Sequence, residues 1–205
     1  MPNIAVIYYS STGSTHSIAQ AFVEGATEAG AEVRLRRADE LAPQSIIDAN
    51  PVWSAHLQAT EHIEVATPDD LAWADGYVLG APTRFGQPAS QLKQFIDTTS
   101  GPWGAGLLAG KPASVFTSTT ERHGGQEATL LALAHTLFHW GATIVPTGYV
   151  DYPLSHAAGG NPYGVSAITG DGAPDEHVLT LARFQGKRVA EMSALLKPVQ
   201  SPVAA

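Results

Sequence analysis

A six-residue loop of small side chains constrains this chain more than any other feature of the sequence. Residues 10–15 read Ser-Ser-Thr-Gly-Ser-Thr and directly follow a strand-like run, residues 4–9. A helical apolar period then covers residues 17–29. A strand, a hydroxyl-rich turn and a helix N-terminus together form an anion site, because free N–H groups and the helix dipole face the ligand. The loop contains no Lys or Arg, so we expect neutral donors to hold a phosphate.

The same residues argue against the other common phosphate loops. A Walker A loop requires Gly-Lys-Ser/Thr, and a dinucleotide fingerprint requires three glycines where Gly13 stands alone. The pattern Ser-x-Thr-Gly-x-Thr instead resembles the loop with which flavodoxins hold the monophosphate of FMN. The alternative that stays open is a Ser/Thr-rich turn that only caps the helix.

Charge and composition limit the classes of partner that this chain can bind. The net charge is −8 and cysteine is absent. An acidic chain lacks the basic patch that nucleic acids or anionic membranes require. Without cysteine, redox chemistry needs a bound cofactor. No apolar run approaches the length of a membrane span, and no signal peptide is visible. We expect a cytoplasmic protein with no membrane or nucleic-acid partner.

Strand and helix patterns alternate along most of the chain. The sequence predicts strands at residues 4–9, 32–36, 76–80, 112–117 and 142–145. It predicts helices at residues 17–29, 90–98, 127–140 and 176–196. This alternation is typical of an α/β fold, a flavodoxin-like doubly wound five-stranded parallel sheet with helices on both faces. We expect a single FMN-binding domain over residues 1–196, a flexible tail over 197–205, and long irregular segments at 42–66 and 148–174.

Ligands of such sheets bind at the carboxyl ends of the strands, so the loops after the predicted strands matter most. After the third strand, Thr83 can bond a ring edge and Phe85 can cover an aromatic face. Arg84 can favour a reduced, anionic flavin, although a surface ion pair is the commoner role of a lone Arg. After the fourth strand, residues 118–126 combine hydroxyls with paired glycines, which suits a loop close to a polar ligand.

Four motifs together make a resemblance specific. Residues 82–86 read Pro-Thr-Arg-Phe-Gly, 124–127 Gly-Gly-Gln-Glu, 160–164 Gly-Asn-Pro-Tyr-Gly and 182–186 Ala-Arg-Phe-Gln-Gly. The chain thereby resembles the flavodoxin-like NAD(P)H:quinone oxidoreductases of the WrbA type, in order from residue 3 to about 193. The resemblance implies FMN as cofactor, NADH or NADPH as electron donor, quinones as substrates, and a homotetramer.

The resemblance also implies site residues. FMN contacts fall on the first loop and on those after the third and fourth strands: Ser10, Ser11, Thr12, Gly13, Ser14, Thr15, Pro82, Thr83, Arg84, Phe85, Gly86, Ser118, Thr119, Thr120 and Gly124. His139 matches a histidine beside the flavin and is the candidate catalytic residue. Trp103 matches an aromatic residue of the quinone pocket. Thr12 stands where some members carry an aromatic residue that contacts the nicotinamide, so a substrate role is expected there.

Histidine spacing offers one other interpretation. His135 and His139 lie four residues apart on a predicted helix, which is metal-ligand spacing. The zinc-protease pattern requires Glu at position 136, where this chain has Thr, and no third ligand is evident. We therefore expect no metal site.

Three functions follow from these patterns. The leading hypothesis is an FMN-dependent enzyme that reduces quinones to hydroquinones by two electrons, with ping-pong kinetics. The second is a flavodoxin-type electron carrier, whose acidic surface would dock basic partners. The third is a regulatory protein-interaction flavoprotein.

Overall fold

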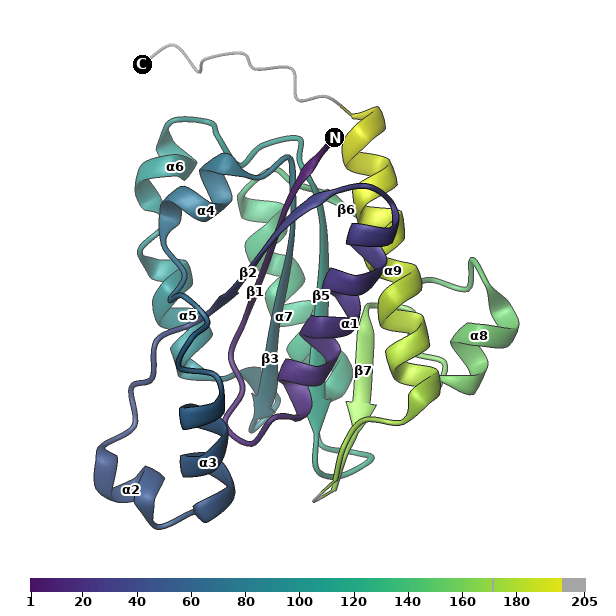
Figure 1. Cartoon of the computed structure of the whole chain (residues 1–205). Coiled ribbons are helices and arrows are strands. Elements are labelled where there is room, and N and C mark those ends of the chain that lie inside the picture. The colour runs from purple at the N-terminus through teal and green to yellow at the C-terminus, as the bar shows by residue number, and fades with distance from the viewer. Residues whose placement is uncertain (171, 197–205) are drawn as a thin grey trace.

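A parallel sheet forms the centre of the molecule. The computed structural model describes residues 1–170 and 172–196. The strands lie in the order β2-β1-β3-β5-β6, and each neighbouring pair is parallel. In that order they are β2 (Glu32–Arg37), β1 (Asn3–Tyr8), β3 (Gly76–Arg84), β5 (Pro112–Thr119) and β6 (Thr143–Ile144). This is the flavodoxin order, so the predicted fold class is confirmed (Figure 1).

The fifth strand of the sheet is split in two. β6 pairs with the first residues of β5, whereas β7 (Val165–Ile168) pairs with its last four. The chain between them leaves the sheet and forms α8 (Tyr152–Ala157). The segment 148–174, which we expected to be irregular, therefore contains a helix and a strand. β4 (Gln87–Pro88) is short and antiparallel to the end of β3.

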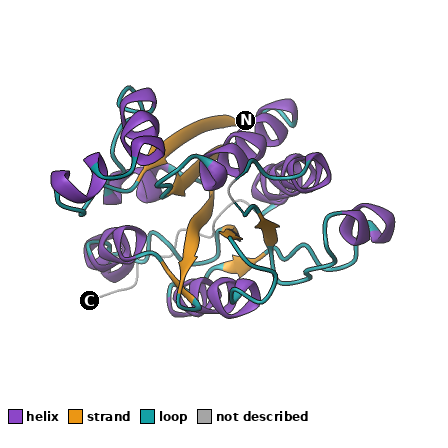
Figure 2. Ribbon diagram, turned by 90° about the horizontal axis from the view of Figure 1, so that it is seen from below, coloured by secondary structure: helices purple, strands orange, loops and turns teal. Residues whose placement is uncertain are grey.

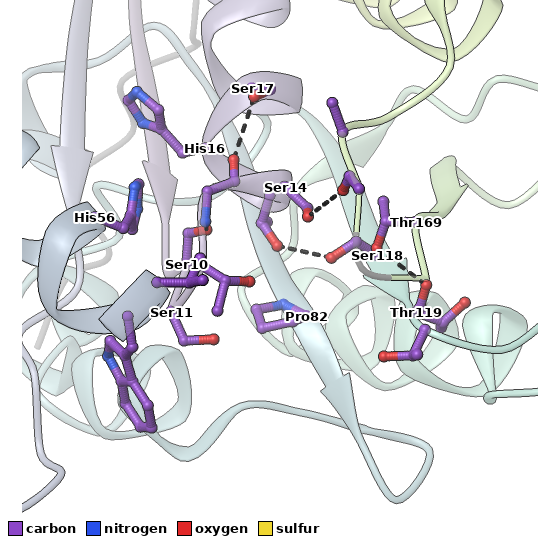
Figure 3. Close-up of a pocket in the computed structure, with 18 of the residues that line it drawn as sticks. Ser10, Ser11, Ser14, His16, Ser17, His56, Pro82, Ser118, Thr119 and Thr169 are labelled. Atoms are coloured by element: carbon purple, nitrogen blue, oxygen red, sulfur yellow. Dashed lines mark hydrogen bonds between the residues drawn. The ribbon is translucent and has the colours of Figure 1, made fainter. Parts of the chain in front are cut away.

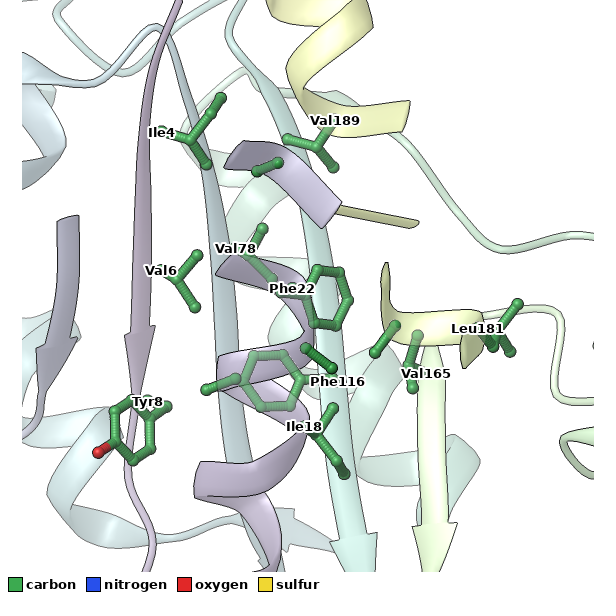
Figure 4. Close-up of a cluster of buried hydrophobic side chains, with 14 of the residues drawn as sticks. Ile4, Val6, Tyr8, Ile18, Phe22, Val78, Phe116, Val165, Leu181 and Val189 are labelled. Carbon is green, nitrogen blue, oxygen red and sulfur yellow. The ribbon is translucent and has the colours of Figure 1, made fainter. Parts of the chain in front are cut away.

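Helices cover both faces of the sheet (Figure 2). The helices α1 (Ser14–Glu28) and α9 (Glu176–Leu195) lie on one face, and α5 (Ser90–Asp97) and α7 (Gln126–His139) on the other. Side chains of a strand alternate between the faces. Accordingly, Ile4, Val6 and Tyr8 pack with α1 and α9 (Figure 4), whereas Ala5, Ile7 and Tyr9 pack with α5 and α7.

Two glycines let α1 and α9 touch backbone to backbone. A Cβ on Gly25 would lie 1.8 Å from the carbonyl oxygen of Arg183, and one on Gly186 would lie 2.2 Å from that of Phe22. Neither gap admits a methyl group, so both positions require glycine at this helix spacing. The position of α1 is thereby fixed by α9.

Short helices lie at both edges of the sheet. At the edge where the strands begin lie α4 (Pro68–Trp73) and α6 (Ser100–Gly104) (Figure 1). At the edge where they end lie α2 (Gln44–Asp48) and α3 (Pro51–Ala59). Both α2 and α3 fall in segment 42–66, so the expectation of an irregular segment is wrong there. The sequence of α3 has no clear apolar stripe, and all of its residues are accordingly at least partly exposed.

Three sequence expectations stand apart from this architecture. The tail at 197–205 lies outside the described residues. The expectation of a single domain stays a prediction. Within residues 1–170 and 172–196, no helix is both long enough and apolar enough to cross a bilayer.

Candidate cofactor-binding site

A cavity of about 800 Å³ lies at the carboxyl edge of the sheet. Five segments of the chain line it (Figure 3). They are the loop 10–17, residues 50, 52, 53 and 56 at α3, residues 82–84 at the end of β3, residues 118–120 at the end of β5, and residues 169, 170, 172 and 173 beyond β7. Its volume lies in the usual range of cofactor and ligand pockets.

The loop 10–15 presents neutral donors to this cavity. Gly13 has a φ of 105° and precedes the first residue of α1, so the helix begins at Ser14 rather than at the expected residue 17. Among the described residues no side chain caps α1, and its first turn carries no acidic residue. The N–H groups of that turn therefore remain available to an anion.

Hydroxyl groups join this loop to the neighbouring strand ends. Thr15 and Ser118 are buried, and their Oγ atoms lie 2.9 Å apart. Ser14 Oγ donates to the carbonyl of Gly172 at 3.2 Å. Because these contacts cross from α1 to the end of β5 and to the segment after β7, they hold the donor groups in fixed positions (Figure 3).

The end of β3 forms the next part of the lining. Thr83 Oγ1 lies 2.8 Å from Thr129 Oγ1 and 3.2 Å from the carbonyl oxygen of Gly124. Arg84 donates through Nη2 to Ser11 Oγ at 3.2 Å and through Nη1 to the carbonyl of Thr83. Both acceptors are neutral oxygens, so Arg84 keeps its positive charge at the mouth of the cavity.

The helix α3 forms the opposite wall and is held by one carboxylate. Glu40 accepts five hydrogen bonds of 2.8–3.0 Å. Its donors are Tyr9 Oη, Trp53 Nε1, Gln91 Nε2 and the N–H groups of Leu41 and Ala42. Burial alone would raise the pKa of Glu40, but these bonds outweigh burial and lower it.

Two histidines lie side by side next to the loop. The ring of His16 lies 5.4 Å from that of His56, and its Nδ1 lies 2.7 Å from Tyr8 Oη. Burial, together with the charges of His56 and His62, lowers the pKa of His16 to about 4. Burial also lowers the pKa of His56. Both rings line the cavity (Figure 3).

Comparison with known proteins identifies the family. The family model described as NADPH-dependent FMN reductase matches residues 2–156. A protein of Deinococcus radiodurans named NAD(P)H dehydrogenase (quinone) is 44% identical over 94% of this chain and 96% of its own length. One of the same name from Caulobacter vibrioides is 43% identical over 96% and 99%. The chain belongs to the NADPH-dependent FMN reductase family.

Solved structures agree with that assignment. The flavodoxin, WrbA-like protein from Agrobacterium tumefaciens has a TM-score of 0.66 at 25% identity and covers 96% of this chain and 99% of its own. The resemblance to the WrbA type is thereby confirmed. A flavodoxin from the domain Archaea, with a TM-score of 0.62 and 16% identity, covers 94% and 99% and shows the shared fold.

Most of the expected FMN contacts line the cavity. These are Ser10, Ser11, Thr12, Gly13, Ser14, Thr15, Pro82, Thr83, Arg84, Ser118, Thr119 and Thr120. Phe85, Gly86 and Gly124 do not line it. Phe85 has a positive φ of 54° at the β3–β4 turn and a fully exposed side chain. Gly86 packs against Gly125 of the α7 turn, where a Cβ on Gly125 would lie 2.8 Å from the Gly86 Cα.

His139 and Trp103 lie at the other edge of the sheet. His139 is the last residue of α7, which starts beyond the end of β5 and leads into β6, opposite the start of β5. Trp103 Nε1 donates to the carbonyl of His139 at 3.0 Å. Within one chain, His139 therefore lies away from the carboxyl edge where the flavin is expected, because α7 runs away from that edge. Neither residue lines the cavity of its own chain.

The sequence interpretation missed the wall formed by α3. Asn50 Oδ1 accepts from the N–H groups of Val52 and Trp53, and Pro51 occupies the first turn. An Asn followed by Pro is a typical start of a helix, so this signal was present in the sequence. The described residues contain no cluster of three or more His, Cys, Asp or Glu that could hold a metal ion.

Proposed function

We propose that this protein is an FMN-dependent NAD(P)H:quinone oxidoreductase that reduces quinones by two electrons. The observation that carries the proposal is the cavity itself, where the neutral donor loop 10–15 meets the ends of β3 and β5. The relatives named NAD(P)H dehydrogenase (quinone) cover nearly the whole chain and support the same activity.

The donor set of this cavity fits FMN. A phosphate needs several N–H and O–H donors and no carboxylate nearby, which matches the first turn of α1 and the hydroxyls of Ser10, Thr12 and Thr15. An isoalloxazine ring needs neutral partners along its polar edge. The backbone from Pro82 to Arg84 and the hydroxyls of residues 118–120 line the same cavity and supply such partners.

The chain contributes binding and positioning to the proposed reaction. When bound, FMN supplies the two-electron hydride chemistry that side chains lack. The loop 10–15 anchors the phosphate, and the ends of β3 and β5 orient the ring. Arg84 carries positive charge at the cavity mouth, where it stabilises negative charge that develops during reduction. NAD(P)H and quinone then occupy the same open position in turn, which gives ping-pong kinetics.

We further propose a cytoplasmic homotetramer in which neighbouring subunits complete each quinone pocket. Trp103 and Phe138 are 54% and 63% exposed at the amino edge, and Phe85 is wholly exposed at the carboxyl edge. A monomer tends to bury such aromatic area against a partner. Trp103 and His139, which lie far from their own cavity, would serve a neighbour's cavity.

The assembly is tested with Trp103→Ala. We expect the KM for quinone to rise more than that for NADH, while the Kd of FMN stays unchanged. Subunit dissociation should lower activity while FMN remains bound. An active protein that stays monomeric on a sizing column at micromolar concentration would contradict the shared pocket.

The activity is tested by adding FMN to the purified apoprotein. We expect a 1:1 flavin spectrum that NADH or NADPH bleaches and benzoquinone restores, with hydroquinone as the product. An electron carrier would instead accumulate a stable semiquinone and oxidise NAD(P)H slowly. A protein that binds no FMN would contradict the proposal and would favour the regulatory alternative.

A further inference from the structure

The helix α3 places an imidazole against the loop that we assign to the FMN phosphate. His56 Nδ1 lies 3.5 Å from the position that a Cβ on Gly13 would occupy. Gly13 is the residue at which the chain turns into α1, and its neighbours supply the free N–H groups. His56 therefore stands beside the anion-binding end of α1, on the side opposite Ser118 (Figure 3).

The position of His56 is well defined. Trp53 precedes it by one helical turn, and its indole N–H is held by Glu40. The main-chain carbonyl of His56 accepts hydrogen bonds from the N–H and the hydroxyl of Thr60, which is buried. The bond from Trp53 to Glu40 thus holds α3 one turn before His56, and the His56 ring contacts that of His16 beside the loop.

The charged and titratable groups around His56 allow this imidazole to take up one positive charge. The titratable and charged groups around His56 and its neighbour His16 are Tyr8 of β1, Tyr9 just after β1, Arg37 of β2, Glu40, His62 after α3, and Arg84 at the cavity. Arg37 donates to the carbonyl of Ile63, and Glu40 is saturated with donors. His16 is half-buried beside Tyr8, and because its pKa is lowered to about 4 it stays neutral near neutral pH. His56, whose Nδ1 faces Gly13, is the histidine of this pair that can accept a proton at the cavity.

We propose that His56 is a proton-linked partner of the FMN phosphate, so that FMN binding draws a proton onto this imidazole. The inference rests on the proposed function, since it takes the loop 10–15 as the phosphate site. A phosphate dianion beside an imidazole favours the charged ring, and the loop itself contains no Lys or Arg to supply that charge. His56 would then make retention of FMN weaker as pH rises.

The sign of the effect follows from linkage. Burial keeps the pKa of His56 below its usual value in the free protein, and the phosphate raises it in the complex. The added affinity is therefore fully present below the pKa of the free protein. It is lost as pH rises through the pKa of the complex.

The test compares FMN binding by the native apoprotein and by His56→Gln, between about pH 6 and about pH 8. We expect the Kd of the native protein to rise about tenfold more than that of the variant over this range, since one pKa unit corresponds to a factor of ten. The second ionisation of phosphate affects both proteins alike and cancels in the comparison. His135→Gln, the same change at an exposed site on α7, serves as the matched control and should behave as the native protein does.

Riboflavin and calorimetry make the test specific. Riboflavin lacks the phosphate, so its Kd should show no difference in pH dependence between native protein and His56→Gln. Titrations in buffers of different ionisation enthalpy should show proton uptake with FMN that the variant lacks. Equal pH dependence of FMN binding in both proteins, or the same pH difference with riboflavin, would overturn the role of His56. Failure of every form to bind FMN would overturn the proposed function instead.

Discussion

The two walls of the cavity are built in different ways. The loop 10–15 grows directly out of β1, and its Thr15 is buried against Ser118 of β5. The wall formed by α3 has no buried residue and is joined to the rest largely through Glu40. The sheet therefore fixes the position of one wall of the site, whereas the position of the other wall depends on the carboxylate of Glu40. Removing that carboxylate should loosen α3 without disturbing the loop.

Replacing Glu40 with Ala is the strongest way to separate the two walls. The change leaves the donors of Tyr9, Trp53 and Gln91 without their shared acceptor. We expect α3 to lose roughly 3 kcal/mol of protection, because each hydrogen bond to a charged group contributes about 1.5–3 kcal/mol and solvent replaces part of the loss. Hydrogen exchange read by mass spectrometry should show faster exchange in residues 44–59 and unchanged exchange in α1.

Glu40→Gln is the matched control for that prediction. It preserves the size of the side chain and one acceptor oxygen but replaces the other with a donor. We expect an intermediate effect on α3. Equal loss of protection in α1 and α3 would show that Glu40 supports the whole edge of the sheet rather than one wall.

Replacing Thr15 with Val tests the wall formed by the loop 10–15. The change removes a hydroxyl from the proposed phosphate site and leaves Ser118 Oγ without its partner. We expect the Kd of FMN to rise about tenfold or more, from a loss of roughly 1.5–3 kcal/mol, while riboflavin binds almost as before. Fluorescence titration with both flavins measures this, and Thr15→Ser should restore most of the preference. A Val variant that keeps its full preference for FMN over riboflavin would disprove the assignment of the loop.

Trp53→Phe should give the smallest effect of the three. The ring that lines the cavity is retained, and only the bond from the indole N–H to Glu40 is lost. We expect about 1.5 kcal/mol less protection of α3 against exchange, the lower end of the range for a bond to a charged group, and a change in the Kd of FMN of less than about threefold. If Trp53→Phe instead matches Glu40→Ala, the indole bond alone holds α3, and the other bonds of Glu40 do not contribute.

The sequence predicted the loop wall because consecutive residues carry it. A strand, six small residues and a helix are local features, so residues 10–15 could be assigned without knowing any long-range contact. The wall formed by α3 was missed because an exposed helix shows no apolar stripe, although Asn50 and Pro51 marked its start. Its role depends on Glu40 and Gln91, which are distant in sequence and meet only in the fold.

His139 lies away from its expected position beside the flavin for a geometric reason. A helix that follows a parallel strand runs back antiparallel to it, so a residue at the end of α7 must reach the opposite edge of the sheet. The direction of α7 therefore follows from the alternation of strands and helices in the sequence alone. Resemblance gave the residue a role, but it did not say which subunit's cavity the residue would serve.

The backbone contact between α1 and α9 has a consequence for biosynthesis. The loop 10–15 is among the first parts of the chain to be synthesised, yet the helix that follows it packs against Gly186 near the other end. A nascent chain therefore exposes the apolar face of α1 until translation is almost complete. We therefore expect FMN to bind at the proposed site only after α9 has left the ribosome, and a chain that stops before Gly186 should not retain FMN.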